Sequence, residues 1–111
     1  MSSPITPSKF KERTMTADVA KWFTDIGTSE KVCVLGVYGC VTVAEAGKII
    51  VLSDEDGTDP FLTISLETAG AMFSHTFPNN GIPLLKGVDI KANTNGTTGS
   101  ATFTIVIGTW V

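Results

Sequence analysis

The densest group of residues able to do chemistry is an acidic cluster in the middle of the chain. It follows a short apolar run, residues 48–53, and consists of Asp54, Glu55, Asp56 and Asp59. Carboxylate oxygens are good ligands for Ca²⁺, which takes about 6 to 8 of them. The order of a calcium loop, with alternating Asp residues, a Gly and a distal Glu, is missing here. We therefore interpret the cluster as a solvated turn, disfavour calcium at Asp54, Asp56 and Asp59, and expect no cofactor.

Other arrangements that support catalysis are incomplete. A glycosidase needs two carboxylates at a defined separation in a cleft, with a raised pKa on one of them, and a turn at a loop tip offers no such cleft. His75 alternates with Phe73 and Phe77, and no Ser or Cys nucleophile constellation surrounds it in the sequence. We interpret His75 as a residue at the edge of the core. We expect no enzymatic activity and no catalytic residues.

The two cysteines favour neither a disulfide nor a metal site. Cys33 and Cys40 lie on a predicted strand followed by a bend, where their Cβ atoms are expected to be too far apart or on different faces. A structural zinc site takes about four Cys or His ligands, and the chain has two Cys and one His. We expect two reduced thiols and no metal.

Length and charge limit the kinds of partner. A chain of 111 residues is one domain by length and can bury a core without cross-links. Its net charge of −3 opposes binding to nucleic acid or to an anionic membrane. No apolar run approaches the roughly 20 residues of a membrane-spanning helix, and the first residues lack the order of a signal peptide. We expect a soluble protein, made in the cytosol, that binds neither nucleic acid nor membrane.

The elements that must position these residues are short strands. From residue 31 onward, apolar runs and period-two alternation recur between turn residues, which is typical of an antiparallel all-β domain. Val32 to Tyr38 is apolar throughout, so both of its faces should be covered, and Gly36 and Gly39 indicate a bulge or a close backbone approach. The predicted strands lie at 32–38 with a continuation at 41–43, and at 48–53, 62–66, 71–78, 82–85, 88–92 and 101–107.

Residues 16–27 have two interpretations. Val19, Trp22, Phe23 and Ile26 have the spacing of an amphipathic helix that Thr16 would cap. Against a helix, residues 22–24 have strand propensity and residues 27–30 resemble a hairpin turn. We favour a strand because all the downstream elements are β.

Residues 1–15 are predicted to form an N-terminal arm, and residues 16–111 a β-sandwich domain. The arm contains two prolines and clustered small polar residues. It is either a disordered terminus or a segment that orders against a neighbouring subunit. In the second case the anchors are Ile5, Phe10 and Trp22, and the groups that reach acidic surface are Lys9, Lys11 and Arg13.

Together these features predict an antiparallel β-sandwich or a jelly-roll-like barrel of about 7 to 8 short strands. Polar positions on the predicted strands are rich in Thr and Ser and poor in charge. Such faces suit broad contact with another protein better than a diffusible substrate.

The order of elements resembles the small β-sandwich proteins of tailed-phage virions, which are capsid decoration, cement or fibre-type components. The resemblance spans about residues 31–107 and is carried by the segments KVCVLGVY (31–38), KIIVLSDEDG (48–57), FPNNGIPLLKGVDI (77–90) and ATFTIVI (101–107). It implies a virion protein that binds the major capsid protein on the outer capsid surface and stabilises the shell. It also implies a homo-oligomer, with a trimer favoured. It transfers no functional residue.

Two other function classes have distinct expectations. A receptor- or glycan-binding module of a fibre should expose aromatic residues on its long loops, and residues 54–60 and 93–100 contain none. A hydrolase on a jelly-roll scaffold should bring titratable groups together, and the chain has few. The fibre module is the alternative to a decoration protein.

Overall fold

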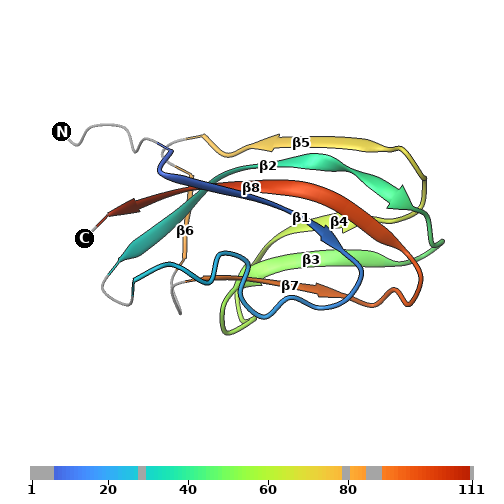
Figure 1. Ribbon diagram of the computed structural model, residues 1–111, viewed down its shortest axis with the longest axis horizontal. Coiled ribbons are helices and arrows are strands. Elements are labelled where there is room, and N and C mark those ends of the chain that lie inside the picture. Colours follow the sequence, from blue (N-terminus) through green and yellow to red (C-terminus); the bar gives the residue numbers. More distant parts are fainter. Residues whose placement is uncertain (1–6, 28–29, 79–80, 85–88, 111) are drawn as a thin grey trace.

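A computed structural model describes residues 7–27, 30–78, 81–84 and 89–110, and the elements within these ranges are all strands. No helix in the described ranges has the length and apolar character needed to cross a membrane. Figure 1 shows the strands, which are β1 (Lys9–Met15), β2 (Lys31–Val43), β3 (Ile49–Asp54), β4 (Pro60–Ser65), β5 (Met72–Thr76), β6 (Ile82–Pro83), β7 (Ile90–Thr94) and β8 (Ser100–Trp110).

The strands form two antiparallel sheets that pack face to face. The larger sheet has the order β1-β8-β2-β5, and β6 pairs with β2 beyond the end of β5. The smaller sheet has the order β4-β3-β7. In Figure 1 the larger sheet lies above the smaller one, and connecting segments run from one sheet to the other. The predicted all-β sandwich is thus confirmed.

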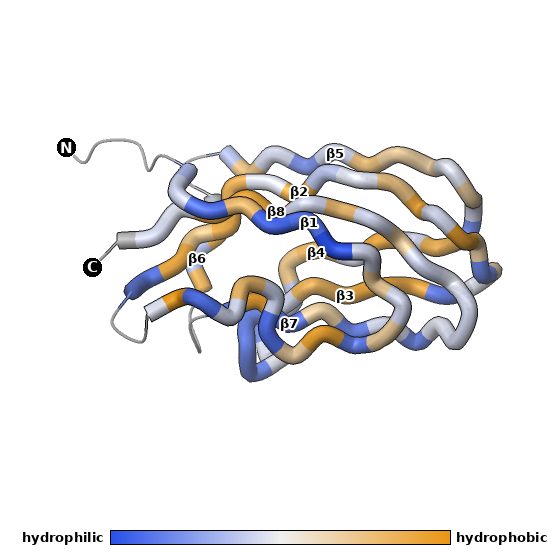
Figure 2. The backbone as a smooth tube through the Cα atoms, in the orientation of Figure 1, coloured by the Kyte–Doolittle hydropathy of each residue, from blue (hydrophilic) through white to orange (hydrophobic). Residues whose placement is uncertain are grey.

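The core lies between the sheets and is built by period-two alternation. Phe103, Ile105 and Ile107 of β8 are buried, while the residues between them are partly exposed. From the smaller sheet, Ile50, Leu52 and Ile64 pack against them. Figure 2 shows β3 as an almost continuous hydrophobic segment. The run 48–53 that precedes the acidic cluster therefore does supply a central strand, as its composition predicts.

β2 contains both predicted apolar runs, 32–38 and its continuation at 41–43, in one strand. It continues from Lys31 to Val43 with register shifts against β8 between Val34 and Gly36 and between Val41 and Val43. The first shift confirms the bulge that the glycines indicate. At Gly39, an added Cβ would meet the carbonyl oxygen of Thr102 at 2.2 Å, so only glycine allows β2 and β8 to approach this closely.

The predicted arm of residues 1–15 is wrong for its second half. Lys9–Met15 is strand β1, which pairs with β8 from Lys9↔Ile107 to Met15↔Ala101. Met15 is buried in the core. The boundary predicted at residue 15 therefore cuts the larger sheet, because β1 belongs to the sandwich. Residues 1–6 lie outside the described residues.

Residues 16–27 form neither the helix nor the regular strand that the sequence left open. They bend from β1 across to the smaller sheet, where Val19 makes an isolated bridge with Ala92 and the N–H of Trp22 donates to the carbonyl of Ile90. This crossing segment, residues 16–27, lies beside β7 and closes one side of the sandwich.

A buried carboxylate holds the crossing segment in place. Asp89 is 2 % exposed, and it accepts hydrogen bonds from the N–H groups of Phe23 at 3.0 Å, Thr24 at 2.8 Å and Ile90 at 2.7 Å. Thr24 has a φ of 66°, which is rare for a β-branched residue. The Asp89 hydrogen bond to its N–H accompanies this conformation.

A second carboxylate organises the loop between β7 and β8. Glu45 accepts hydrogen bonds from the N–H groups of Thr97 at 2.8 Å, Thr98 at 3.0 Å and Gly99 at 2.9 Å. These bonds favour the ionised form, and they lower the pKa of Glu45 from 4.5 to about 2. These bonds tie the loop to the β2–β3 turn.

Candidate protein-binding face

The strongest candidate for a functional surface is the side of the larger sheet that points away from the smaller one. We call it the outer face. Alternation and register assign to it every second residue of β1, β8, β2 and β5. Its rows, read from β1 to β5, are Phe10, Val106, Gly36 and Thr76; then Glu12, Thr104, Tyr38 and Ser74; then Thr14, Thr102, Cys40 and Met72.

Two apolar side chains project from opposite corners of the outer face. Phe10 is 77 % exposed and Met72 is 87 % exposed. Between them lie mainly hydroxyl side chains, and Glu12 is the charged residue of the face. Depletion of charge together with exposed aromatic residues and Met distinguishes protein interfaces from ordinary surface. The prediction of a Thr-rich, charge-poor face thus has a definite location.

Tyr38 gives the outer face a fixed shape. A Cβ placed on Gly36 would meet the Tyr38 hydroxyl at 2.2 Å, so the phenol ring lies directly over this glycine. The Tyr38 hydroxyl is also within hydrogen-bond distance, 3.0 Å, of Thr76 Oγ1 on β5. The ring therefore covers bare backbone and connects β2 with β5, in the way that aromatic residues compensate for glycine in sheets.

Beside Tyr38 the outer face is hollowed. An open hollow of about 550 Å³ extends from Glu12 and Thr102 to Met72, and Gly39 and Cys40 also line it. Glu12 is the titratable carboxylate on its wall, and no other acidic or basic residue lines it in the described part of the chain. The hollow therefore offers contact surface with one carboxylate, and the Tyr38 hydroxyl and the Cys40 thiol also line it.

The six predicted partner-binding residues do not lie together. Phe10 is on the outer face, exposed as a partner anchor requires. Trp22 is 0 % exposed, and its ring stacks on Phe103 with centroids 4.6 Å apart. The prediction of Trp22 as an anchor is wrong, because it closes the core. Ile5 lies outside the described residues.

The basic residues of β1 point to the other side of the strand. Lys9 pairs with Asp25, with Nζ 3.2 Å from Oδ2. Arg13 donates from Nε and Nη2 to the carbonyl of Trp22 at 2.9 and 2.7 Å and lies over the indole. Lys11 is partly buried on the same side, and its carbonyl accepts from Trp22 Nε1 at 3.0 Å. Lys9 and Arg13 thus fasten the crossing segment, so a cluster of free cations for an acidic partner is not formed.

The acidic cluster contains one carboxylate with a structural role. Asp54 is buried, and it accepts from Thr58 N–H at 2.9 Å, Thr58 Oγ1 at 3.1 Å and Asp59 N–H at 3.2 Å. Burial raises the pKa of Asp54, but the hydrogen bonds outweigh it and hold the pKa below the ordinary value. Within the described ranges, no three His, Cys, Asp or Glu side chains are grouped as metal ligands require.

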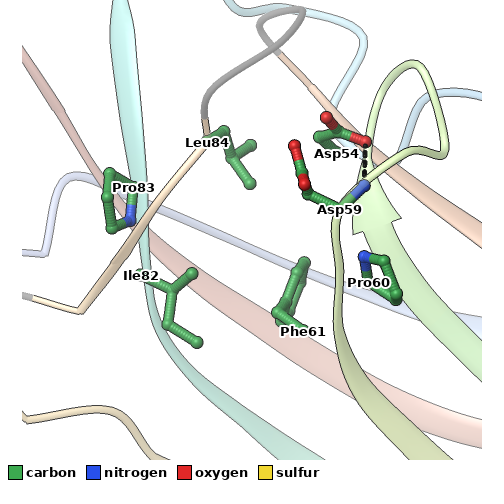
Figure 3. A pocket seen from close by; sticks show the side chains of 7 residues that line it. All are labelled: Asp54, Asp59, Pro60, Phe61, Ile82, Pro83 and Leu84. Atoms are coloured by element: carbon green, nitrogen blue, oxygen red, sulfur yellow. Dashed lines mark hydrogen bonds between the residues drawn. The ribbon is translucent and has the colours of Figure 1, made fainter.

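A smaller hollow lies next to this turn, at one end of the sandwich. Figure 3 shows Asp54 and Asp59 on one side of it and Ile82, Pro83 and Leu84 on the other, with Phe61 between them. Its volume is about 260 Å³, below the range of about 300 to 1,000 Å³ typical of ligand pockets. Since the Asp54 carboxylate is occupied by the turn, the hollow does not offer a pair of free carboxylates.

The two cysteines lie on β2 and His75 lies on β5. Cys33 and Cys40 are both free. Cys33 is buried with Sγ 3.6 Å from the carbonyl oxygen of Gly108, and burial raises the pKa of its thiol, which makes it a poor nucleophile. His75 is exposed on the edge strand β5. Its position at the edge agrees with the sequence, but its side chain is not packed.

Met72 and Tyr38 are the outer-face residues that the sequence analysis missed. Met72 alternates with Ser74 and Thr76, so period two already places it on the polar side of β5. Tyr38 ends an apolar run. Because both faces of that run were expected to be covered, the sequence did not indicate that the Tyr38 side chain lies on the outer face. Comparison of the chain with protein-family models, curated proteins and solved structures gave no match.

Proposed function

We propose that this chain is a virion structural protein that binds a protein shell through its outer face. The composition of this face carries the proposal. Phe10 and Met72 are exposed across a broad four-stranded surface of hydroxyl side chains with one carboxylate, Glu12. Its hydroxyl groups lose less free energy of hydration than charged groups would when another protein covers and hydrogen-bonds them, and its two apolar corners supply anchors.

The resemblance to small β-sandwich proteins of tailed-phage virions supplies the proposed partner, the major capsid protein, and the proposed place, the outer capsid surface. A protein that binds the assembled shell stabilises it by mass action, because the bound copies are lost when the shell comes apart. The activity is therefore mechanical. The trimer favoured by the resemblance belongs to this proposal as the assembly bound to the capsid, and it is separate from self-association in solution without capsids.

The fold changes how the proposal has to be tested. Removal of residues 1–14 would delete most of β1 and expose the edge of β8, since β1 pairs with β8 along its whole length. Such a deletion tests folding before it tests attachment. Point substitutions on the outer face leave the backbone pairing intact.

The experiment compares Phe10→Asp with Thr63→Asp. Thr63 is exposed on β4 of the smaller sheet, so both variants add one carboxylate to an exposed strand position. We expect Phe10→Asp to weaken binding to expanded capsids by about tenfold or more, the cost of losing one anchor. Thr63→Asp should bind like the unaltered protein, and binding should raise the temperature at which the capsids disrupt.

Two results would contradict the proposal. If the unaltered protein fails to bind capsids and instead gives hits on a glycan array, the chain is a glycan-binding fibre module. If Phe10→Asp binds capsids as tightly as the unaltered protein, the outer face is not the attachment surface. Circular dichroism of both variants checks that the fold is retained.

A further inference from the structure

The two edges of the larger sheet differ in how their backbone is protected. At the β1 edge, Trp22 Nε1 donates to the carbonyl of Lys11 at 3.0 Å, and the side chain of Arg13 reaches the carbonyl of Trp22. Charged side chains and covering segments are the usual protection of an edge strand. Along the β5 edge, Met72–Thr76 contains no Lys, Arg, Asp or Glu, and among the described residues no covering segment hydrogen-bonds to its outer side.

The pairing of β5 with β2 shows which backbone groups point outward. The N–H of Phe77 donates to Leu35 at 3.0 Å, and the N–H of Val41 donates to Ala71 at 2.9 Å. These bonds fix the alternation along the ladder, so residues 73 and 75 point their backbone groups at β2. Met72, Ser74 and Thr76 point theirs away from the sheet, and no partner for these groups occurs among the described residues.

We propose that β5 pairs with β5 of a second copy of this chain, antiparallel and about a two-fold axis between the two Ser74 residues. In this register Ser74 lies opposite Ser74 of the second copy, and Met72 lies opposite Thr76 of the second copy. Each outward-pointing N–H and C=O of the strand then meets a complementary group. The pairing extends the larger sheet from one subunit into the next.

Three observations favour a second copy as the occupant. The outward groups are centred on Ser74, so an identical strand pairs with full overlap. β5 carries no formal charge from acidic or basic residues that its own copy would repel. In the other sheet, the β7 edge is met by the crossing segment through Val19 and Ala92, and β4 is a weaker candidate because it begins with Pro60, which has no N–H to donate.

The pairing also covers exposed apolar surface. Met72 is 87 % exposed and would lie at the join, where the outer faces of the two subunits become one continuous surface. The inference does not depend on capsid binding. It predicts an isologous dimer, and pairing of one strand with itself about a two-fold axis cannot close a trimer.

The test measures the mass of the full chain in solution without capsids. Sedimentation over a range of concentrations should show a shift from 11.7 kDa toward twice that mass. Ser74→Lys places two ammonium groups across the axis, and we expect it to raise the dimer Kd by about tenfold or more. The control Thr14→Lys adds the same charge to the outer face at the protected β1 edge and should leave the dimer unchanged.

Amide hydrogen exchange on the unaltered protein gives a second measurement that needs no variant. The amides of Met72, Ser74 and Thr76 should exchange more slowly as the concentration rises, while exchange in β1 should not change. A protein that stays monomeric at every concentration overturns the inference. So does a dimer or trimer that persists in Ser74→Lys, or one that leaves these three amides unprotected.

Discussion

The two sides of the sandwich are closed by different means. On the β1 and β7 side, the crossing segment buries Trp22 and Phe23 and is fastened by Asp89, Arg13 and the bridge between Val19 and Ala92. On the β4 and β5 side, half-buried aromatic rings meet instead, with Phe61 and Phe77 edge to face at 6.1 Å. We call these the closed side and the open side.

We interpret the closed side as the one that stabilises the fold and the open side as the one available for interaction. Polar groups on the closed side are used inside the molecule, including the basic residues that the sequence alone assigned to a partner. The open side leaves backbone groups of β5 and the side chain of Met72 at the surface. We expect substitutions on the closed side to change the free energy of unfolding most, and those on the open side to change self-association.

The largest effect is expected from Trp22→Ala. Trp22 is fully buried and stacked on Phe103, so its removal should cost about 3 to 5 kcal/mol in the free energy of unfolding. Phe61→Ala on the open side is the control, and since Phe61 is half-buried it should cost about 1 to 2 kcal/mol. Urea unfolding of both variants measures the difference. Equal costs would show that the two sides are closed equally firmly.

Asp89→Ala should have the next largest effect. It leaves the N–H groups of Phe23, Thr24 and Ile90 without their acceptor, at an expected cost of about 2 to 4 kcal/mol. Asp25→Ala removes the exposed partner of Lys9 from the same segment and should cost at most about 1 kcal/mol. Thermal unfolding compares the two. A small loss in Asp89→Ala would mean that apolar packing alone holds the crossing segment.

Acid should weaken the β7–β8 loop through Glu45. Its pKa is lowered from 4.5 to about 2, so its ionised form stabilises the fold above about pH 4.5, and this contribution is lost as the pH falls toward 2. Glu45→Gln should be less stable than the unaltered protein at neutral pH, with a gap that narrows across this window. Glu12→Gln, on the outer face, is the control. Urea midpoints at several pH values test it, and a gap independent of pH would contradict the role of Glu45.

The strands whose inward positions are apolar could be predicted from the sequence. β3, β4 and β8 lie close to their predicted positions because Ile50, Ile64 and Phe103 alternate with polar or partly exposed residues. The acidic cluster was correctly placed in a turn. The sequence could not identify Asp54 as the buried hydrogen-bond acceptor of this turn, because an acidic residue in a turn can be either buried or exposed.

β1 could not be recognised because its inward positions are charged. Lys9, Lys11 and Arg13 lie on the inward side of the strand, and in a sequence they appear as a polar terminus. Their inward orientation is compatible with charge because Arg13 and Lys9 find acceptors on the crossing segment. Those acceptors exist only after residues 16–27 have crossed to the other sheet.

The sequence by itself determined the all-β class, the central strands and a Thr-rich surface poor in charge, because alternation is a local property of the chain. Tertiary structure decided which face and which edge remain open. β1 joins a strand about ninety positions away, and Trp22 leaves the predicted binding surface to fill the space above Phe103. These choices depend on contacts between distant segments, and local propensity does not specify such contacts.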